Sequence, residues 1–168
     1  RYHVGLEAGS KTELIAAIAC SRDREALIVC NGYKDEEFID LALHAQRMGL
    51  QTILVIEMPG ELVRILARAH HMKVRPRLGV RAKLSSRAGG HWDASGGDRS
   101  KFGLDTAQVL ELADDLRTAG MLDSLQMLHY HLGSQVSDIR RVRTALQEAC
   151  RFYVELHREG SAMGFINL

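Results

Sequence analysis

Short apolar runs alternate with amphipathic segments along this chain, and the alternation constrains its fold more than any other feature. Runs rich in Val, Ile and Leu predict buried strands, whereas apolar residues at helical spacing predict helices. The resulting period of roughly thirty residues is that of a strand followed by a helix. Strands are expected at residues 2–9, 26–30, 52–57, 77–84, 125–132 and 164–168, and helices at 11–20, 35–48, 59–71, 106–119 and 139–159.

Strands joined through helices run parallel, which leaves an open doubly wound sheet or a closed eight-stranded barrel. The dinucleotide-binding form of the open sheet has little support, because Gly5 and Gly9 do not have the spacing of its glycine motif. A barrel instead takes its active groups from the ends of several strands. Polar residues stand at five such ends: Glu7, Asn31, Glu57, Arg81 and His131.

Six strands are too few to close a barrel, which takes about 250 residues. The chain also begins at Arg1 rather than at methionine, and it stops at Leu168 inside a predicted strand. The sequence therefore predicts an α/β fold, an incomplete parallel (β/α)8 barrel. We expect residues 1–168 to be one part of a barrel domain in a protein that is longer on both sides.

Two local signals mark the predicted helices. Ser10 stands where a helix N-cap is expected, and Glu13 three residues later completes the pattern of a capping box. Pro59 fits the first turn of the helix that follows the third strand.

The stretch from Leu125 to Gln135 is an apolar strand that ends in polar groups. Two histidines inside a buried strand need a reason, since such strands are almost continuously apolar. We interpret His129 as a hydrogen-bonded core residue. For His131 we favour a ligand site, because a glycine and the hydroxyl of Ser134 follow it and such a turn suits an anion such as phosphate.

Charge and cysteine content exclude several classes of function. The net charge of +1 arises from 22 basic and 21 acidic side chains mixed along the chain, so we predict no nucleic-acid partner. The sequence has no apolar run of about 18 residues and no charged segment followed by an apolar one at its start, so we expect neither membrane insertion nor secretion. Cys20, Cys30 and Cys150 lie in apolar runs at wide spacing. We expect reduced core thiols in a cytoplasmic protein, and no metal site.

Residues 85–100 form the one irregular connection, with four glycines and the only tryptophan of the chain, Trp92. A connection of this length is typical of a functional loop or of a disordered one. A loop that covers substrate or lies at an interface and a mobile surface loop are the two interpretations.

Six stretches in order resemble the bacterial biosynthetic arginine decarboxylases over essentially the whole chain. The wider group comprises the pyridoxal-phosphate decarboxylases with an alanine-racemase-like barrel, including those that act on ornithine and diaminopimelate. Cys-Asn-Gly-Tyr-Lys-Asp and Gly-Gly-x-Trp set the arginine enzymes apart within that group, and both are present here. The six stretches are residues 6–14, 30–35, 55–57, 77–82, 100–104 and 129–135.

The resemblance implies roles for five residues. His131 corresponds to a histidine that stacks on the face of the cofactor ring, and Ser134 to a serine that binds the cofactor phosphate. Arg81 matches an arginine near the phenolic oxygen of the ring. Glu7 and Glu13 match acidic residues near the reacting centre, Glu13 beside the lysine that carries the cofactor, and are the catalytic candidates.

The resemblance also implies pyridoxal 5'-phosphate as cofactor, L-arginine as substrate, and agmatine and carbon dioxide as products in polyamine synthesis. It implies a homo-oligomer, a dimer or a tetramer, with Lys101 at the dimer contact. It also implies Mg²⁺ as a possible second cofactor, for which we identify no ligands in the sequence. The family's cofactor-binding lysine lies upstream of Arg1, and its glycine-rich phosphate loop lies beyond Leu168. We therefore expect the isolated chain to be inactive and the parent protein to be active.

Three alternatives stay open. The same fold and cofactor serve enzymes that act on ornithine, lysine or diaminopimelate. A degenerate copy would be a non-catalytic regulatory protein that resembles a decarboxylase, although His131, Ser134 and Arg81 are intact. A phosphate-binding barrel of sugar metabolism would need a different catalytic set.

Overall fold

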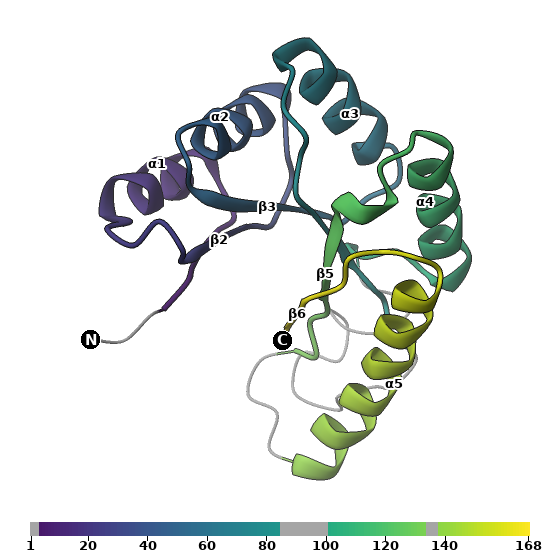
Figure 1. Ribbon diagram of the computed structural model, residues 1–168. Helices are drawn as coiled ribbons and strands as arrows, with labels where there is room; N and C mark the ends of the chain where they lie inside the picture. Colours follow the sequence, from purple (N-terminus) through teal and green to yellow (C-terminus); the bar gives the residue numbers. More distant parts are fainter. Residues whose placement is uncertain (1–3, 85–100, 134–137) are drawn as a thin grey trace. The chain divides into compact units, whose positions relative to one another are not determined.

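The computed structural model describes residues 4–84, 101–133 and 138–168. Within these residues six strands alternate with five α-helices, which confirms the predicted alternation (Figure 1). The chain divides into two compact units, residues 1–79 and 80–168, which we describe one at a time. The elements are β1 (Leu6–Ala8), α1 (Lys11–Cys20), β2 (Leu27–Cys30), α2 (Glu36–Arg47), β3 (Gln51–Ile56), α3 (Glu61–Met72), β4 (Leu78–Arg81), α4 (Thr106–Thr118), β5 (Leu125–His129), α5 (Ile139–Arg158) and β6 (Phe165–Asn167).

The strands are hydrogen-bonded in the order β1-β2-β3-β4-β5-β6, which is also their order along the chain. β1 pairs in parallel with β2, β2 with β3, and β5 with β6. A doubly wound sheet reverses its strand order at a switch point, whereas a barrel keeps the order of the chain. The fold is therefore that of part of a parallel (β/α)8 barrel, as predicted from the sequence.

The core of the first unit lies between its helices and strands. α1 packs on β1, and α2 packs on β3 and beside α1 and α3 (Figure 1). The residues of β3 from Thr52 to Ile56 are all buried, as expected for a strand covered on both faces. The Oγ1 atom of Thr52 donates a hydrogen bond of 2.9 Å to the Ala42 carbonyl, so the one polar side chain of this run has a partner in α2.

Helix starts agree with the sequence signals in part. The Oγ atom of Ser10 accepts from Glu13 N at 3.3 Å, as the capping box predicts. The return bond differs, because Glu13 Oε2 accepts from Gly9 N rather than from Ser10 N. Pro59 is not in the first turn of α3, contrary to the prediction. Gly60 adopts a φ of +83° and caps the helix, so the chain turns once more before α3 begins.

The second unit contains the parallel pair of β5 and β6, in which Met127 lies opposite Phe165. α5 buries Ala145, Ala149 and Leu156 along one face, and Asp105 forms a full capping box at the start of α4. The sequence analysis did not identify that box. Residues 85–100, for which a functional or mobile loop was expected, lie outside the described residues.

Only one of the three cysteines is a core thiol. Cys30 is buried at the end of β2, whereas Cys20 and Cys150 are exposed, and all three are free. The expectation of three core thiols was wrong because both exposed cysteines lie in helices. Successive helical residues are about 100° apart around the axis, so Cys150 points away from the core that Ala149 enters.

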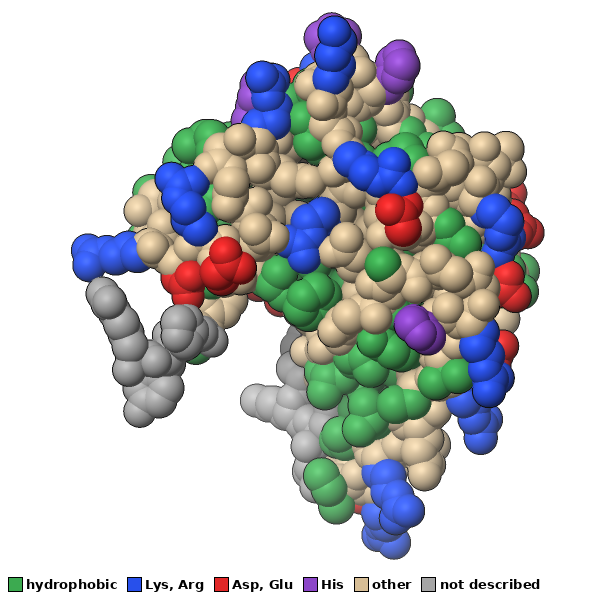
Figure 2. All heavy atoms as spheres, viewed as in Figure 1, with side chains coloured by type: hydrophobic (Ala, Val, Ile, Leu, Met, Phe, Trp, Pro, Cys, Tyr) green, Lys and Arg blue, Asp and Glu red, His purple; other side chains and the backbone are tan. Residues whose placement is uncertain are grey.

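Charged side chains of both signs are distributed over the visible face, and Lys and Arg do not gather in one patch there (Figure 2). This distribution agrees with the balanced composition of the sequence. Among the residues that the structure describes, no helix has the length and apolar character needed to span a bilayer.

Candidate functional site

Polar side chains stand at the carboxyl end of each of the first five strands, as predicted. In the first unit they are Glu7 within β1, Asn31 directly after β2 and Glu57 directly after β3. In the second unit they are Arg81, the last residue of β4, and His131, two residues beyond β5. Barrel enzymes place their reacting groups at this edge of the strands. In each unit, the carboxyl end of the strands is therefore the candidate site.

The turns that follow β1 and β2 are in contact. Asn31 N donates to Ala8 O at 2.9 Å, and Gly32, with a φ of +76°, lies against Gly9. A Cβ atom at Gly32 would lie only 2.6 Å from Gly9 O, so no other residue fits there without movement. Gly9 N in turn donates to Glu13 Oε2 at 2.7 Å. Glu13 is thus held at the candidate site by backbone of its own turn, while the side chain of Glu7 is exposed.

The side-chain amide of Asn31 is buried and has no hydrogen-bond partner among the residues that the structure describes. The residue is 6% exposed, and neither Nδ2 nor Oδ1 has a partner within the described residues. A buried amide without partners costs about 1–3 kcal/mol. A buried polar side chain that lowers stability next to the candidate site is more typical of a functional residue than of a packing residue.

A buried ion pair lies behind the same turn. The side chains of Lys34 and Glu61 are both 0% exposed, and Lys34 Nζ lies 3.5 Å from Glu61 Oε2. Burial lowers the pKa of Lys34, and the nearby carboxylates of Glu61 and Glu57 oppose that shift. The sequence analysis did not identify this pair. No signal marks it, because lysine is usually exposed and the two residues are 27 positions apart (61 − 34).

Arg81 is half-buried at the end of β4. Its guanidinium carbon lies 5.8 Å from the centre of the Phe102 ring. Leu104 N donates to Arg81 O at 2.8 Å, so residues 101–104 run beside the end of β4. Lys101, for which a dimer contact was expected, is exposed, and its Nζ lies 5.6 Å from the centre of the same ring.

The two histidines of β5 and its extension have different surroundings. His129 is 6% exposed, and its Nδ1 lies 2.8 Å from Asn167 Oδ1, which confirms a hydrogen-bonded core residue. His131 is exposed, and the Gly133 that follows has a φ of +110°. Ala82 N donates to His129 O at 2.9 Å, so Arg81 and His131 come from the ends of neighbouring strands. Ser134 lies outside the described residues.

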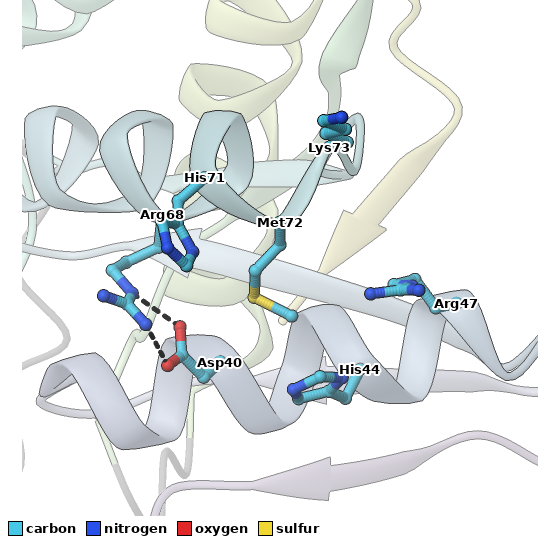
Figure 3. Close-up of a pocket in the computed structure, with 7 residues that line it drawn as sticks. All are labelled: Asp40, His44, Arg47, Arg68, His71, Met72 and Lys73. Atoms are coloured by element: carbon cyan, nitrogen blue, oxygen red, sulfur yellow. Dashed lines mark hydrogen bonds and ion pairs between the residues drawn. The ribbon is translucent and has the colours of Figure 1, made fainter.

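A cavity away from these strand ends lies between α2 and α3 (Figure 3). Its volume is about 460 Å³, and its lining residues are Asp40, His44, Arg47, Arg68, His71, Met72 and Lys73. Asp40 is already paired, since Arg68 Nε donates to its Oδ1 at 2.7 Å. Most of the other residues belong to the last turns of the two helices, which in a strand-helix repeat lie opposite the carboxyl edge. Basic side chains there complement the helix dipoles, so we place the site at the carboxyl edge.

The carboxyl ends of the strands carry carboxylates in the first unit, and an imidazole and a guanidinium in the second. In residues 4–84, 101–133 and 138–168 no three His, Cys, Asp or Glu side chains are grouped so as to hold a metal ion. A flat imidazole next to a turn with positive φ is suited to a flat anionic ligand, and Arg81 contributes positive charge beside it.

Comparison with protein families gives one match over almost the whole chain. Residues 2–168 match the family described as pyridoxal-dependent decarboxylase, pyridoxal binding domain. A curated relative from Proteus mirabilis, named biosynthetic arginine decarboxylase, is 55% identical over 94% of this chain and 25% of its own length. The chain thus spans about a quarter of the curated relatives that it matches first.

Two solved structures resemble the chain closely in fold. A biosynthetic arginine decarboxylase from Campylobacter jejuni has a TM-score of 0.85 and 37% identity, covering 98% of this chain and 26% of its own. A diaminopimelate decarboxylase from Helicobacter pylori, in complex with L-lysine, has a TM-score of 0.82 and covers 96% of this chain and 40% of its own. Its identity is 22%, so that likeness concerns the fold alone.

Proposed function

Because the chain belongs to the pyridoxal-dependent decarboxylase family, we propose that it is the cofactor-binding part of a longer enzyme that decarboxylates L-arginine. The products would be agmatine and carbon dioxide, and the pathway polyamine synthesis. The identity of 55% over 94% of the chain to a relative named for arginine carries this proposal. The parent protein would be longer than residues 1–168, since the chain spans 25% of that relative, and the resemblance implies an extension on both sides.

The described residues fit pyridoxal phosphate. The bound cofactor supplies an electron sink for the pair released when the substrate carboxylate leaves as carbon dioxide. His131 is exposed at the carboxyl edge, where its imidazole would support one face of the flat ring. The left-handed turn at Gly133 leads into Ser134, which would bind the phosphate.

Charged residues at the same edge would orient the reacting groups. Arg81 would stabilise negative charge on the phenolic oxygen of the ring, and the contact with Phe102 limits the positions of its guanidinium. Glu13, whose Oε2 is held by Gly9 N, would lie beside the lysine that carries the cofactor. Glu7 would be the acidic residue of the first described strand at the site.

The assembly and location belong to the same proposal. The enzyme would be a cytoplasmic homo-oligomer, a dimer or a tetramer, with exposed Lys101 at the contact between subunits. Ornithine, lysine and diaminopimelate are the alternative substrates, and a non-catalytic regulatory protein is the alternative without chemistry. The high identity to relatives named for arginine favours arginine over the other substrates.

The experiment is to purify the complete protein, add pyridoxal phosphate, and measure carbon dioxide released from labelled arginine, ornithine, lysine and diaminopimelate. We expect the yellow absorbance of bound cofactor and release from arginine alone. The 168-residue chain, assayed beside it, should release none. Release from another substrate, or absence of both absorbance and release, would exclude the proposal.

A further inference from the structure

The buried ion pair joins two turns at the carboxyl edge of the first unit. Lys34 Nζ donates to Gly32 O at 2.6 Å, in the turn after β2. Glu61 Oε2 accepts from Glu57 N at 2.8 Å and from Met58 N at 3.3 Å, in the turn after β3. With 3.5 Å between Lys34 Nζ and Glu61 Oε2, the pair connects the backbone of one turn to that of the next.

The same contacts continue to Glu13. Gly32 lies against Gly9, as shown by the 2.6 Å that would separate a Cβ at Gly32 from Gly9 O. Gly9 N then donates to Glu13 Oε2 at 2.7 Å. The ion pair is thus bonded to the Gly32 turn, that turn lies against Gly9, and Gly9 is bonded to a carboxylate at the candidate site.

Fold stability alone does not explain a buried ion pair at this position. Burying two charges costs hydration free energy, and the attraction between the charges barely compensates for that cost. Apolar residues of similar volume generally stabilise a fold as well or better. A buried charged pair does, however, allow few geometries, because each partner must keep its hydrogen bonds. Its location at the carboxyl edge, where barrels hold reacting groups, connects that rigidity to the site.

We propose that Lys34 and Glu61 are positioning residues, which hold the Gly32 turn against Gly9 and thereby fix the carboxylate of Glu13 for the reaction. The inference rests on the proposed function. The pair would contact neither cofactor nor substrate, and it would act only through the backbone of residues 9 and 32. Its loss should therefore lower kcat for arginine and leave KM nearly unchanged.

The first test separates position from stability in the complete protein. Lys34→Met alone leaves a buried, unpaired carboxylate and should lower the melting temperature. The double variant Lys34→Met with Glu61→Gln removes both charges of the pair and keeps an acceptor for Glu57 N. Its melting temperature should recover in part, because the buried carboxylate of Glu57 still loses its nearby cation. We expect kcat in the double variant to stay roughly ten- to a hundredfold below wild type. Recovery of wild-type kcat together with stability would show a purely structural pair.

The second test asks whether the pair acts through Glu13. In a background of Glu13→Gln, adding the double substitution should change kcat little, because the group that the pair positions is already altered. An equal loss of kcat in both backgrounds would overturn the proposal. Lys73→Met, the same chemical change at an exposed position after α3, is the matched control and should keep wild-type kcat.

A third variant changes the Gly32 turn and keeps both side chains of the pair. Gly32→Ala should lower kcat, whereas Gly60→Ala has a similar φ of +83° and no atom within 4 Å of the added Cβ, and should not. If the double variant does not fold, these two decide the matter, and unchanged kcat in Gly32→Ala overturns the proposal. If wild-type protein releases no carbon dioxide from arginine, the proposed function fails instead. In that case the melting temperatures of the variants still test whether the ion pair stabilises the fold.

Discussion

The Nδ1 atom of His129 lies 2.8 Å from the Oδ1 atom of Asn167, so the ends of β5 and β6 are joined by side chains as well as by backbone. His131, two residues further along, is exposed. Two histidines of one short stretch thus have different surroundings, and their substitutions should have different consequences.

Substitution of His129 should affect stability. His129→Phe keeps a ring of similar shape but removes the hydrogen bond to Asn167 in a site that is 6% exposed. We expect a loss of about 1–3 kcal/mol in the free energy of unfolding. Denaturant unfolding measures it, and a variant as stable as wild type would show that the bond contributes nothing.

Substitution of His131 should affect the cofactor. His131→Ala removes the ring proposed to lie against pyridoxal phosphate, so cofactor affinity should fall about tenfold. His131→Phe keeps a flat ring and should retain most of the affinity. Stability should change by less than about 0.5 kcal/mol in both, since the side chain is exposed. Cofactor titration by visible absorbance is the measurement, and equal affinities in all three proteins would contradict the stacking role.

Substitution of Arg81 should weaken the same site. Arg81→Met keeps part of the contact with Phe102 but removes the positive charge, and a charged hydrogen bond is worth about 1.5–3 kcal/mol. Cofactor affinity in the complete protein should therefore fall about ten- to a hundredfold. Arg117→Met, at an exposed position of α4, is the control. An unchanged titration curve for Arg81→Met would remove this residue from the proposed site.

The three cysteines should differ in reactivity. Burial raises the pKa of Cys30 to about 12, and its thiol is inaccessible, whereas Cys20 and Cys150 are exposed. Because the thiolate is the reactive form, native protein treated with iodoacetamide at pH 8 should be alkylated at residues 20 and 150 long before residue 30. Mass spectrometry of peptides identifies the modified sites. Equal labelling of all three would mean that β2 opens readily.

Protonation of Asp35 should lower the stability of the fold in acid. Its Oδ2 accepts from Lys11 Nζ at 2.8 Å and its Oδ1 from Phe38 N at 2.9 Å, and these bonds lower its pKa below the usual 3.8. A carboxyl group with a lower pKa in the folded state stabilises the fold fully above its unfolded-state pKa. That contribution is lost as the pH falls through the folded-state pKa. Carbon NMR should show a midpoint below 3.8 that rises toward 3.8 in Lys11→Met. A midpoint at or above 3.8 in wild type would contradict the contact.

Much of the architecture could be predicted because its signals are local. The strand of residues 51–56 contains the continuous apolar run 53–56, and the helix of residues 36–47 has apolar residues at helical spacing, so both lie near their predicted positions. Ser10 at the start of α1 was likewise visible as a cap. The left-handed conformation of Gly60 makes α3 begin at Glu61, after Pro59, and the hydrophobic pattern did not indicate this.

The sequence by itself determined the alternation of strands and helices, the polar strand ends and the resemblance that implies the cofactor, because each depends on residues that are near one another or on identity at given positions. Only the tertiary structure decided which distant residues meet: Lys34 with Glu61 and His129 with Asn167 through their side chains, and Gly32 with Gly9 through their backbones. It also decided that Cys20 and Cys150 face solvent. The physical reason is that burial and pairing depend on how distant segments pack, and hydrophobic periodicity describes one segment at a time.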